Sequence, residues 1–150
     1  MKIKHLFFFV LAFVSAVLAS LLLVGCGSGT AAPDLMPQQV VVKFYRWYIG
    51  YPGNPLVDRE YRHSPCLVES FVQEIDEALD NLSRGGADPI LLAQDVPERF
   101  SVGEVSIAAE RAEALVYLYW NGNPTPSQRR IDLQLTGGEW KITGVSMIEP

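Results

Sequence analysis

Cysteine and histidine are scarce in this chain. Its 150 residues include two cysteines, Cys26 and Cys66, and two histidines, His5 and His63. Two cysteines allow one disulfide at most, which excludes the framework that staples small secreted domains. Structural zinc sites need several Cys and His residues at short spacing, and these four residues cannot supply one. We therefore expect no metal and no cofactor.

Positive charge and phosphate-binding motifs are also lacking. The chain has 12 basic and 17 acidic residues, and its net charge is −5. Proteins hold nucleic acids through Lys and Arg contacts to phosphates, so this balance argues against a nucleic-acid partner. No glycine-rich loop follows a predicted strand, and nucleotide binding has no support either.

The N-terminus carries the pattern of an export signal. Lys2 and Lys4 precede an uncharged apolar run over residues 6–25. The run ends in Leu23-Val24-Gly25-Cys26, which resembles the bacterial lipobox, where the Cys becomes the lipidated N-terminus. We predict a signal peptide over residues 1–25, lipidation at Cys26 and a flexible spacer over residues 26–37.

An uncleaved transmembrane anchor is the alternative, because about 20 apolar residues suffice to cross a bilayer. Both interpretations place the rest of the chain outside the cytoplasm on a bacterial membrane, at its periplasmic side or at the cell surface. Cleavage before Cys26 removes Lys2 and Lys4, which leaves ten basic and 17 acidic residues and a net charge of −7. Such an acidic domain argues against electrostatic docking onto anionic lipid.

Residues 38–86 favour helices. Val41, Phe44, Tyr45 and Tyr48 share one face of a helix predicted over residues 38–49. A second helix is predicted to open at Ser64-Pro65 and to end at Gly85-Gly86. Its apolar stripe consists of Leu67, Phe71, Ile75, Leu79 and Leu82. Its acidic face consists of Glu69, Glu74, Asp76, Glu77 and Asp80. The acidic face is interpreted as solvated surface, with a patch for a cation or a basic partner as the alternative.

Cys66 lies within this predicted helix and would be the one cysteine left after lipidation. We interpret it as a small buried hydrophobe, with a reactive thiol as the alternative.

The last third alternates with a period of two and predicts strands. The predicted strands span residues 101–107, 112–120, 130–135 and 140–148, and residues 136–139 form a hairpin turn. Residues 112–120 are apolar or aromatic on both faces, so this strand should be covered on both sides or line a cavity. Gly144 should mark a bulge or bend. Helices followed by strands predict an α+β fold, a single domain over residues 38–150 with two helices on a curved four-stranded antiparallel sheet.

Between helices and strands lies the acidic connector Ala87–Phe100. Asp88-Pro89 is typical of a cap followed by proline at the first helical position, and Asp95 with Glu98 resembles a capping box. The alternatives are carboxylates that contact a ligand or catalyse a reaction. A calcium site from Asp88, Asp95 and Glu98 has the right ligand type, but the spacing matches no known calcium loop.

Several segments together resemble a known family. They are the aromatic first helix, Asp88-Pro89, Ala93-Gln94-Asp95 and the segment Gly138–Ile142. Over residues 38–148 the chain resembles bacterial lipoproteins of the domain of unknown function 3828 family, which looks like a branch of the nuclear-transport-factor-2-like, cystatin-like superfamily. The resemblance implies a cone-like sheet around helices with a pocket between them. It implies no function, because this superfamily hosts isomerases, dehydratases, transport adaptors and binding modules.

Two functions are compatible with these patterns. The first is a non-enzymatic, membrane-anchored envelope domain that binds a small apolar ligand or an envelope protein, or serves as an accessory domain. Its candidate ligand-binding residues are Tyr45, Tyr48, Gln94, Asp95, Tyr117 and Tyr119. The second is an enzyme of the isomerase or dehydratase type, in which an apolar pocket raises the pKa of Asp88 or Asp95. No Ser–His–Asp set can be assembled around His63, and no residue is assigned as catalytic.

Overall fold

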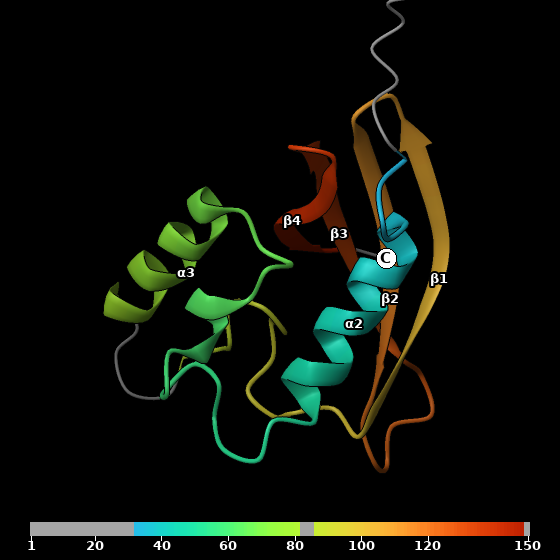
Figure 1. The fold of residues 1–150 in the computed structure, drawn as a ribbon. Helices are drawn as coiled ribbons and strands as arrows, with labels where there is room; N and C mark the ends of the chain where they lie inside the picture. The colour runs from blue at the N-terminus through green and yellow to red at the C-terminus, as the bar shows by residue number, and fades with distance from the viewer. Residues whose placement is uncertain (1–31, 82–85, 149–150) are drawn as a thin grey trace, which may run out of the picture. The chain divides into compact units, whose positions relative to one another are not determined.

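The computed structural model describes residues 32–81 and 86–148 (Figure 1). The predicted signal peptide, Cys26 and Leu82 lie outside the described residues. The described part contains two α-helices, a short 3-10 helix and four strands, and the predicted α+β class is confirmed. Among these residues, no helix combines the length and the apolar character needed to span a membrane.

Helix α2 spans Pro37–Ile49, as its apolar spacing predicts. Pro37 occupies the first turn, where a missing N–H costs nothing, and the Gln39 side chain accepts a hydrogen bond from the Met36 backbone N–H at 2.8 Å. The predicted stripe is buried throughout, at 0–3% exposure: Val41, Phe44, Tyr45 and Tyr48. Leu35, which falls in the predicted spacer, packs against the same core.

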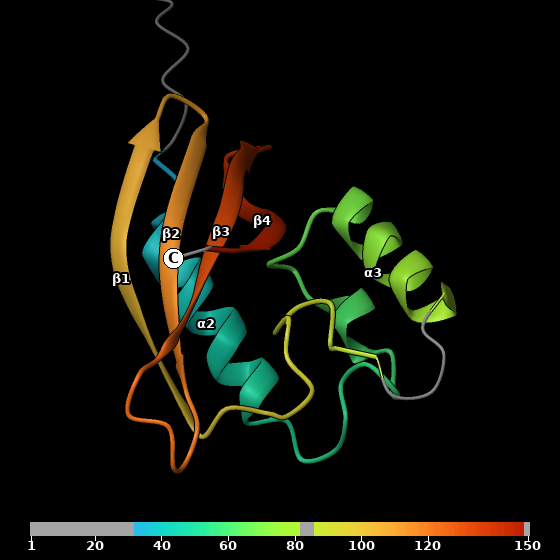
Figure 2. The ribbon, with the colours of Figure 1, turned by 180° about the vertical axis from the view of Figure 1, so that it is seen from behind.

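The four strands form one antiparallel sheet in the order β1-β2-β3-β4. They span Arg99–Ala108, Arg111–Tyr119, Ser127–Thr136 and Glu139–Met147, within a few residues of the predicted bounds. Helix α2 covers one face of the sheet, and Figure 2 shows the other face without a helix over it. The interpretation of β2 as covered on both sides is therefore wrong: its inner residues are buried, whereas Leu115, Tyr117 and Tyr119 are half-buried on the uncovered face.

Two register shifts curve the sheet. Thr143 is the extra residue of β4, because Asp132 pairs with Gly144 and Leu133 pairs with Ile142, and the predicted irregularity near Gly144 is confirmed. The second shift lies in β1 at Gly103. A Cβ atom there would meet the edge of the Tyr117 ring at 2.5 Å, so the absence of a side chain at Gly103 lets this ring approach the bulge closely.

The second helix begins later than predicted. Helix α3 spans Glu69–Asn81, and Ser64-Pro65 does not open it. Ile142 of β4 donates to the Cys66 carbonyl at 2.7 Å and accepts from the Val68 backbone N–H at 3.0 Å. Strand β4 thus satisfies the backbone groups that a helix would have used, and residues 66–68 become a short extension of the sheet edge.

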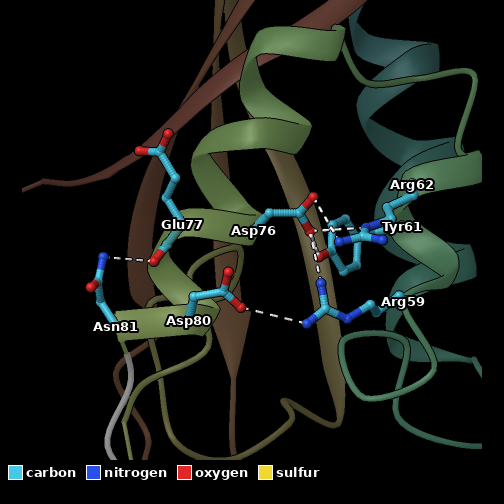
Figure 3. Close-up of polar contacts among 7 residues, drawn as sticks. All are labelled: Arg59, Tyr61, Arg62, Asp76, Glu77, Asp80 and Asn81. Carbon is cyan, nitrogen blue, oxygen red and sulfur yellow. Dashed lines mark hydrogen bonds and ion pairs between the residues drawn. The ribbon is translucent and has the colours of Figure 1, made fainter.

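One side of α3 binds the loop that precedes it (Figure 3). The Tyr61 hydroxyl and the Arg62 guanidinium both donate to the carboxylate of Asp76. Arg59 bridges Asp76 and Asp80 at 3.5 and 3.6 Å. The interpretation of the acidic face as plain solvated surface is wrong for Asp76, because this residue anchors the 3-10 helix Glu60–His63 to α3. Asp80 is exposed, as predicted.

This cluster makes a pH-dependent contribution to stability. Partial burial alone would raise the pKa of Asp76, but the hydrogen bonds from Tyr61 and Arg62 hold it below its ordinary value. A carboxyl with a depressed folded-state pKa stabilises the fold above its unfolded pKa, about 4, and loses that effect as the pH falls through the folded pKa.

Asp76→Asn should lower the free energy of unfolding at pH 7, and its difference from wild type should shrink near pH 3. Urea titrations at both pH values test this. Glu74→Gln, an exposed change on the same helix, is the control; an equal loss in both variants at pH 7 contradicts the assignment.

Candidate functional site

Asp88 organises the connector between α3 and β1. Its carboxylate oxygen Oδ1 accepts hydrogen bonds from the backbone N–H groups of Ile90 and Leu91 at 2.7 and 2.9 Å. The Asp88 backbone N–H donates to the Ala93 carbonyl, and the Leu92 backbone N–H donates to the Asp88 carbonyl. Leu92 takes a positive φ of 50°, which closes the turn. The predicted cap at Asp88-Pro89 is confirmed, although it caps a tight turn and not a helix.

Two tyrosines of α2 hold this turn. The Tyr48 hydroxyl donates to Oδ2 of Asp88 at 2.7 Å, and the Tyr45 hydroxyl donates to the Ile90 carbonyl at 3.4 Å. Burial raises the pKa of Tyr48 well above its ordinary value, and the neighbouring Asp88 raises it further. Tyr48 therefore stays a protonated donor. Burial also raises the pKa of Asp88, while the N–H groups of Leu91 and Ile90 and the Tyr48 hydroxyl oppose that rise.

Arg129 is the residue that sequence reasoning missed. It lies on the inner face of β3 with 1% of its surface exposed. Its guanidinium donates to the carbonyls of Leu91 at 2.6 Å and Leu92 at 3.1 Å, and to Ser127 Oγ and the Gln128 carbonyl. The signal was present in the sequence: extending the alternation of Ile131 and Leu133 backwards places Arg129 on the apolar face.

This buried cluster links three elements: α2 through Tyr45 and Tyr48, the connector through Asp88, and β3 through Arg129. Both carboxylate oxygens of Asp88 already accept hydrogen bonds from the protein. A general base must have an oxygen within reach of a substrate proton. The geometry thus gives Asp88 the role of a structural link, and it gives the tyrosines the role of donors to the connector.

The six predicted ligand-binding residues lie in three different places. Tyr45 and Tyr48 are in the core beneath the sheet, while Gln94 and Asp95 are exposed in the connector. Tyr117 and Tyr119 are on the opposite, uncovered face of the sheet. The structure therefore does not bring the six together around one pocket.

The second half of the connector begins the sheet. The Glu98 backbone N–H donates to the Tyr119 carbonyl at 2.9 Å, and the Trp120 indole N–H donates to the Asp95 carbonyl at 3.1 Å. The predicted capping box of Asp95 and Glu98 is wrong, because the N–H that would bond the Asp95 side chain is used in pairing with β2.

These contacts build an exposed feature at one end of the sheet. The Arg99 guanidinium lies 3.7 Å from the centroid of the Tyr119 ring, and the Tyr119 hydroxyl is 3.3 Å from Ser101 Oγ. Beside them is an open depression of about 420 Å³. We name the following residues the Tyr119 surface: Glu98, Arg99, Tyr119, Trp120 and residues 121–124.

The described residues contain few side chains suited to bind a metal ion or to react as a thiol. Within residues 32–81 and 86–148, no three His, Cys, Asp or Glu side chains are grouped so that they could hold a metal ion. Cys66 is buried, as predicted, and burial raises the pKa of its thiol. A thiol with a raised pKa is less often in the reactive thiolate form.

Comparison with known proteins shows a fold likeness and no family. No protein-family model and no curated protein sequence matches the chain. Two crystal structures of the type VI effector-immunity complex Tae3-Tai3 from Ralstonia pickettii contain a chain of similar fold. The selenomethionine form has a TM-score of 0.60 at 17% identity and covers 77% of this chain and 98% of that chain. The native form has a TM-score of 0.61 at 18% identity and covers 75% and 95%.

The two acids of the connector provide a matched pair of variants. Asp88→Ala removes a turn cap and leaves the buried Tyr48 hydroxyl unpaired, which together should cost about 2–4 kcal/mol. Asp95→Ala changes an exposed side chain and should stay within about 0.5 kcal/mol of wild type. Urea unfolding followed by circular dichroism measures both. Equal effects of the two substitutions would contradict the structural role of Asp88.

Proposed function

We propose that this protein is a bacterial envelope lipoprotein, anchored to the membrane through Cys26 and facing away from the cytoplasm. Support comes from the basic start at Lys2 and Lys4, the apolar run over residues 6–25 and the cysteine that closes it. We also propose that the domain is a branch of the cystatin-like superfamily related to the domain of unknown function 3828 family. Its helix-then-sheet order and single curved sheet agree with that placement.

The folded domain, we propose, binds an envelope protein without catalysis, through the Tyr119 surface. The observation that carries this proposal is the stack of the exposed Arg99 on the half-buried Tyr119 ring, at 3.7 Å from the ring centroid. Arg, Tyr and Trp are the residues that most often dominate the binding energy of protein interfaces. Strand pairing and the Trp120–Asp95 hydrogen bond hold these side chains in place, so little conformational entropy is lost on binding.

The fold likeness supports this proposal indirectly. The similar chains come from complexes between an effector and an immunity protein, that is, from protein–protein assemblies. At 17–18% identity the likeness concerns the fold alone, so the partner of the present chain is inferred from the Tyr119 surface. The isomerase- or dehydratase-like alternative stays a prediction, and the three hydrogen bonds that already hold the Asp88 carboxylate do not favour it.

Anchoring is tested by Cys26→Ala in the native bacterium. The wild-type protein should fractionate with membranes and incorporate labelled palmitate. The variant should lose the label and the mature membrane-bound form, because acyl chains supply the membrane affinity. A variant that is still processed to the same membrane-bound mature form would disprove lipidation at this residue.

Partner binding is tested by a photoreactive amino acid placed in cells at Asn121, an exposed residue of the Tyr119 surface, so that the Arg99–Tyr119 stack stays intact. One adduct of constant mass should form, and Arg99→Ala should reduce it, because the guanidinium that orients the aromatic ring is lost. The control position is Gln73, which is exposed on α3. No adduct at Asn121, or the same adducts at both positions, would contradict a binding role for the Tyr119 surface.

A further inference from the structure

The exposed side of α2 combines positive charge with an aromatic residue. We name six residues the α2 outer face: Gln38, Gln39, Val42, Lys43, Arg46 and Trp47. They line an open depression of about 490 Å³, with the half-buried Val42 and Trp47 as its apolar part. The Trp47 ring lies 6.0 Å from that of Tyr51, which is also half-buried, so the aromatic surface continues beyond the helix.

Charge is distributed unevenly among the described elements. Helix α2 contains Lys43 and Arg46 and no acidic residue, whereas α3 contains five acidic residues and no Lys or Arg. Strands β1, β2 and β4 each carry one acidic and one basic residue, and β3 is balanced on its exposed side because Arg129 is buried. Among these helices and strands, α2 alone therefore presents net positive charge to its surroundings, although Asp34 lines a neighbouring depression together with Lys43. The net acidic charge of the chain argues against docking onto anionic lipid for the domain as a whole, and this face is the exception.

Helix α2 is also the first described element after the proposed anchor. Eleven residues lead from Cys26 to Pro37, and fully extended they span at most about 40 Å. The helix covers one side of the sheet (Figures 1 and 2). Tyr119 and its pairing partner Arg99 belong to the other face of the sheet, because Tyr119 alternates with the buried residues of β2. A domain that rests on the membrane through α2 would thus turn the Tyr119 surface away from it.

We propose that the α2 outer face docks on the anionic phospholipid surface of the membrane in which Cys26 is anchored. Lys43 and Arg46 contact lipid phosphates, and Trp47 lies at the level of the headgroups, where Trp and Tyr side chains are enriched. The acidic α3 is repelled by the same surface, which sets the orientation of the domain. This proposal rests on the proposed lipid anchor and adds an orientation to it.

The test uses the full-length lipoprotein reconstituted in liposomes that contain brominated phosphatidylcholine, with or without one third phosphatidylglycerol. Tryptophan fluorescence should be quenched on the anionic liposomes only, and Trp47→Phe should abolish the quenching. Each neutralised basic residue should reduce the ratio of docked to free domains about 5-fold, so Lys43→Gln with Arg46→Gln should reduce it about 25-fold. High salt should have the same effect.

Arg111→Gln with Arg130→Gln is the matched control, since it removes the same charge from the uncovered face of the sheet. All variants are first compared by circular dichroism and thermal melting. Equal loss of quenching in both double variants, or quenching that survives in Trp47→Phe, overturns the docking proposal. Flotation with the liposomes tests the lipid anchor separately. A protein that floats but shows no Trp47 quenching disproves the docking proposal and leaves the anchor supported. A protein that does not float disproves the anchor.

Discussion

A buried arginine holds the domain together. Arg129 makes four hydrogen bonds, all to neutral oxygen atoms, and two of these are carbonyls of the connector, at Leu91 and Leu92. A buried guanidinium is tolerated only when its donors are satisfied, and a buried carbonyl needs a donor in turn. The connector and the sheet are therefore mutually dependent. Asp88 closes the turn that presents these carbonyls, and Tyr48 fixes Asp88 to α2.

The hydrogen bonds of Arg129 connect the buried core to the proposed binding surface at Tyr119. The connector leaves the Arg129 cluster and enters β1, where Arg99 stacks on Tyr119. The same helix whose inner tyrosines hold the connector carries Lys43 and Arg46 on its outer side. The hydrogen-bonded unit of α2, connector and sheet thus carries both proposed contact surfaces on opposite sides. Rigid elements present binding residues more accurately than mobile loops do.

The sequence predicts the elements well and the site poorly, for physical reasons. The spacing of apolar residues in α2 and their alternation in the strands reflect which side of each element is buried. These patterns lie within single elements, so the sequence predicts the elements correctly. The start of α3 was misplaced because Cys66 pairs with β4, a contact 76 residues away that no local pattern reveals. The cap at Asp88 is predictable from the sequence, because the N–H groups that it binds, of Ile90 and Leu91, are two and three residues away. Arg129 was missed because a charged residue on an inner strand face becomes plausible only when carbonyls from a distant turn approach it.

The most direct test of this account is native-state hydrogen exchange on Arg129→Met, read at residues 88–93 and in strands β2 and β3. Removing the guanidinium takes its donors away from the buried Leu91 carbonyl and the partly buried Leu92 carbonyl. The account predicts that the backbone N–H groups of Asp88 and Leu92 lose protection by tenfold or more, on the order of 1.4 kcal/mol, relative to those of β2 and β3. Unchanged protection of the connector, or an equal loss throughout the sheet, would contradict the central role of Arg129.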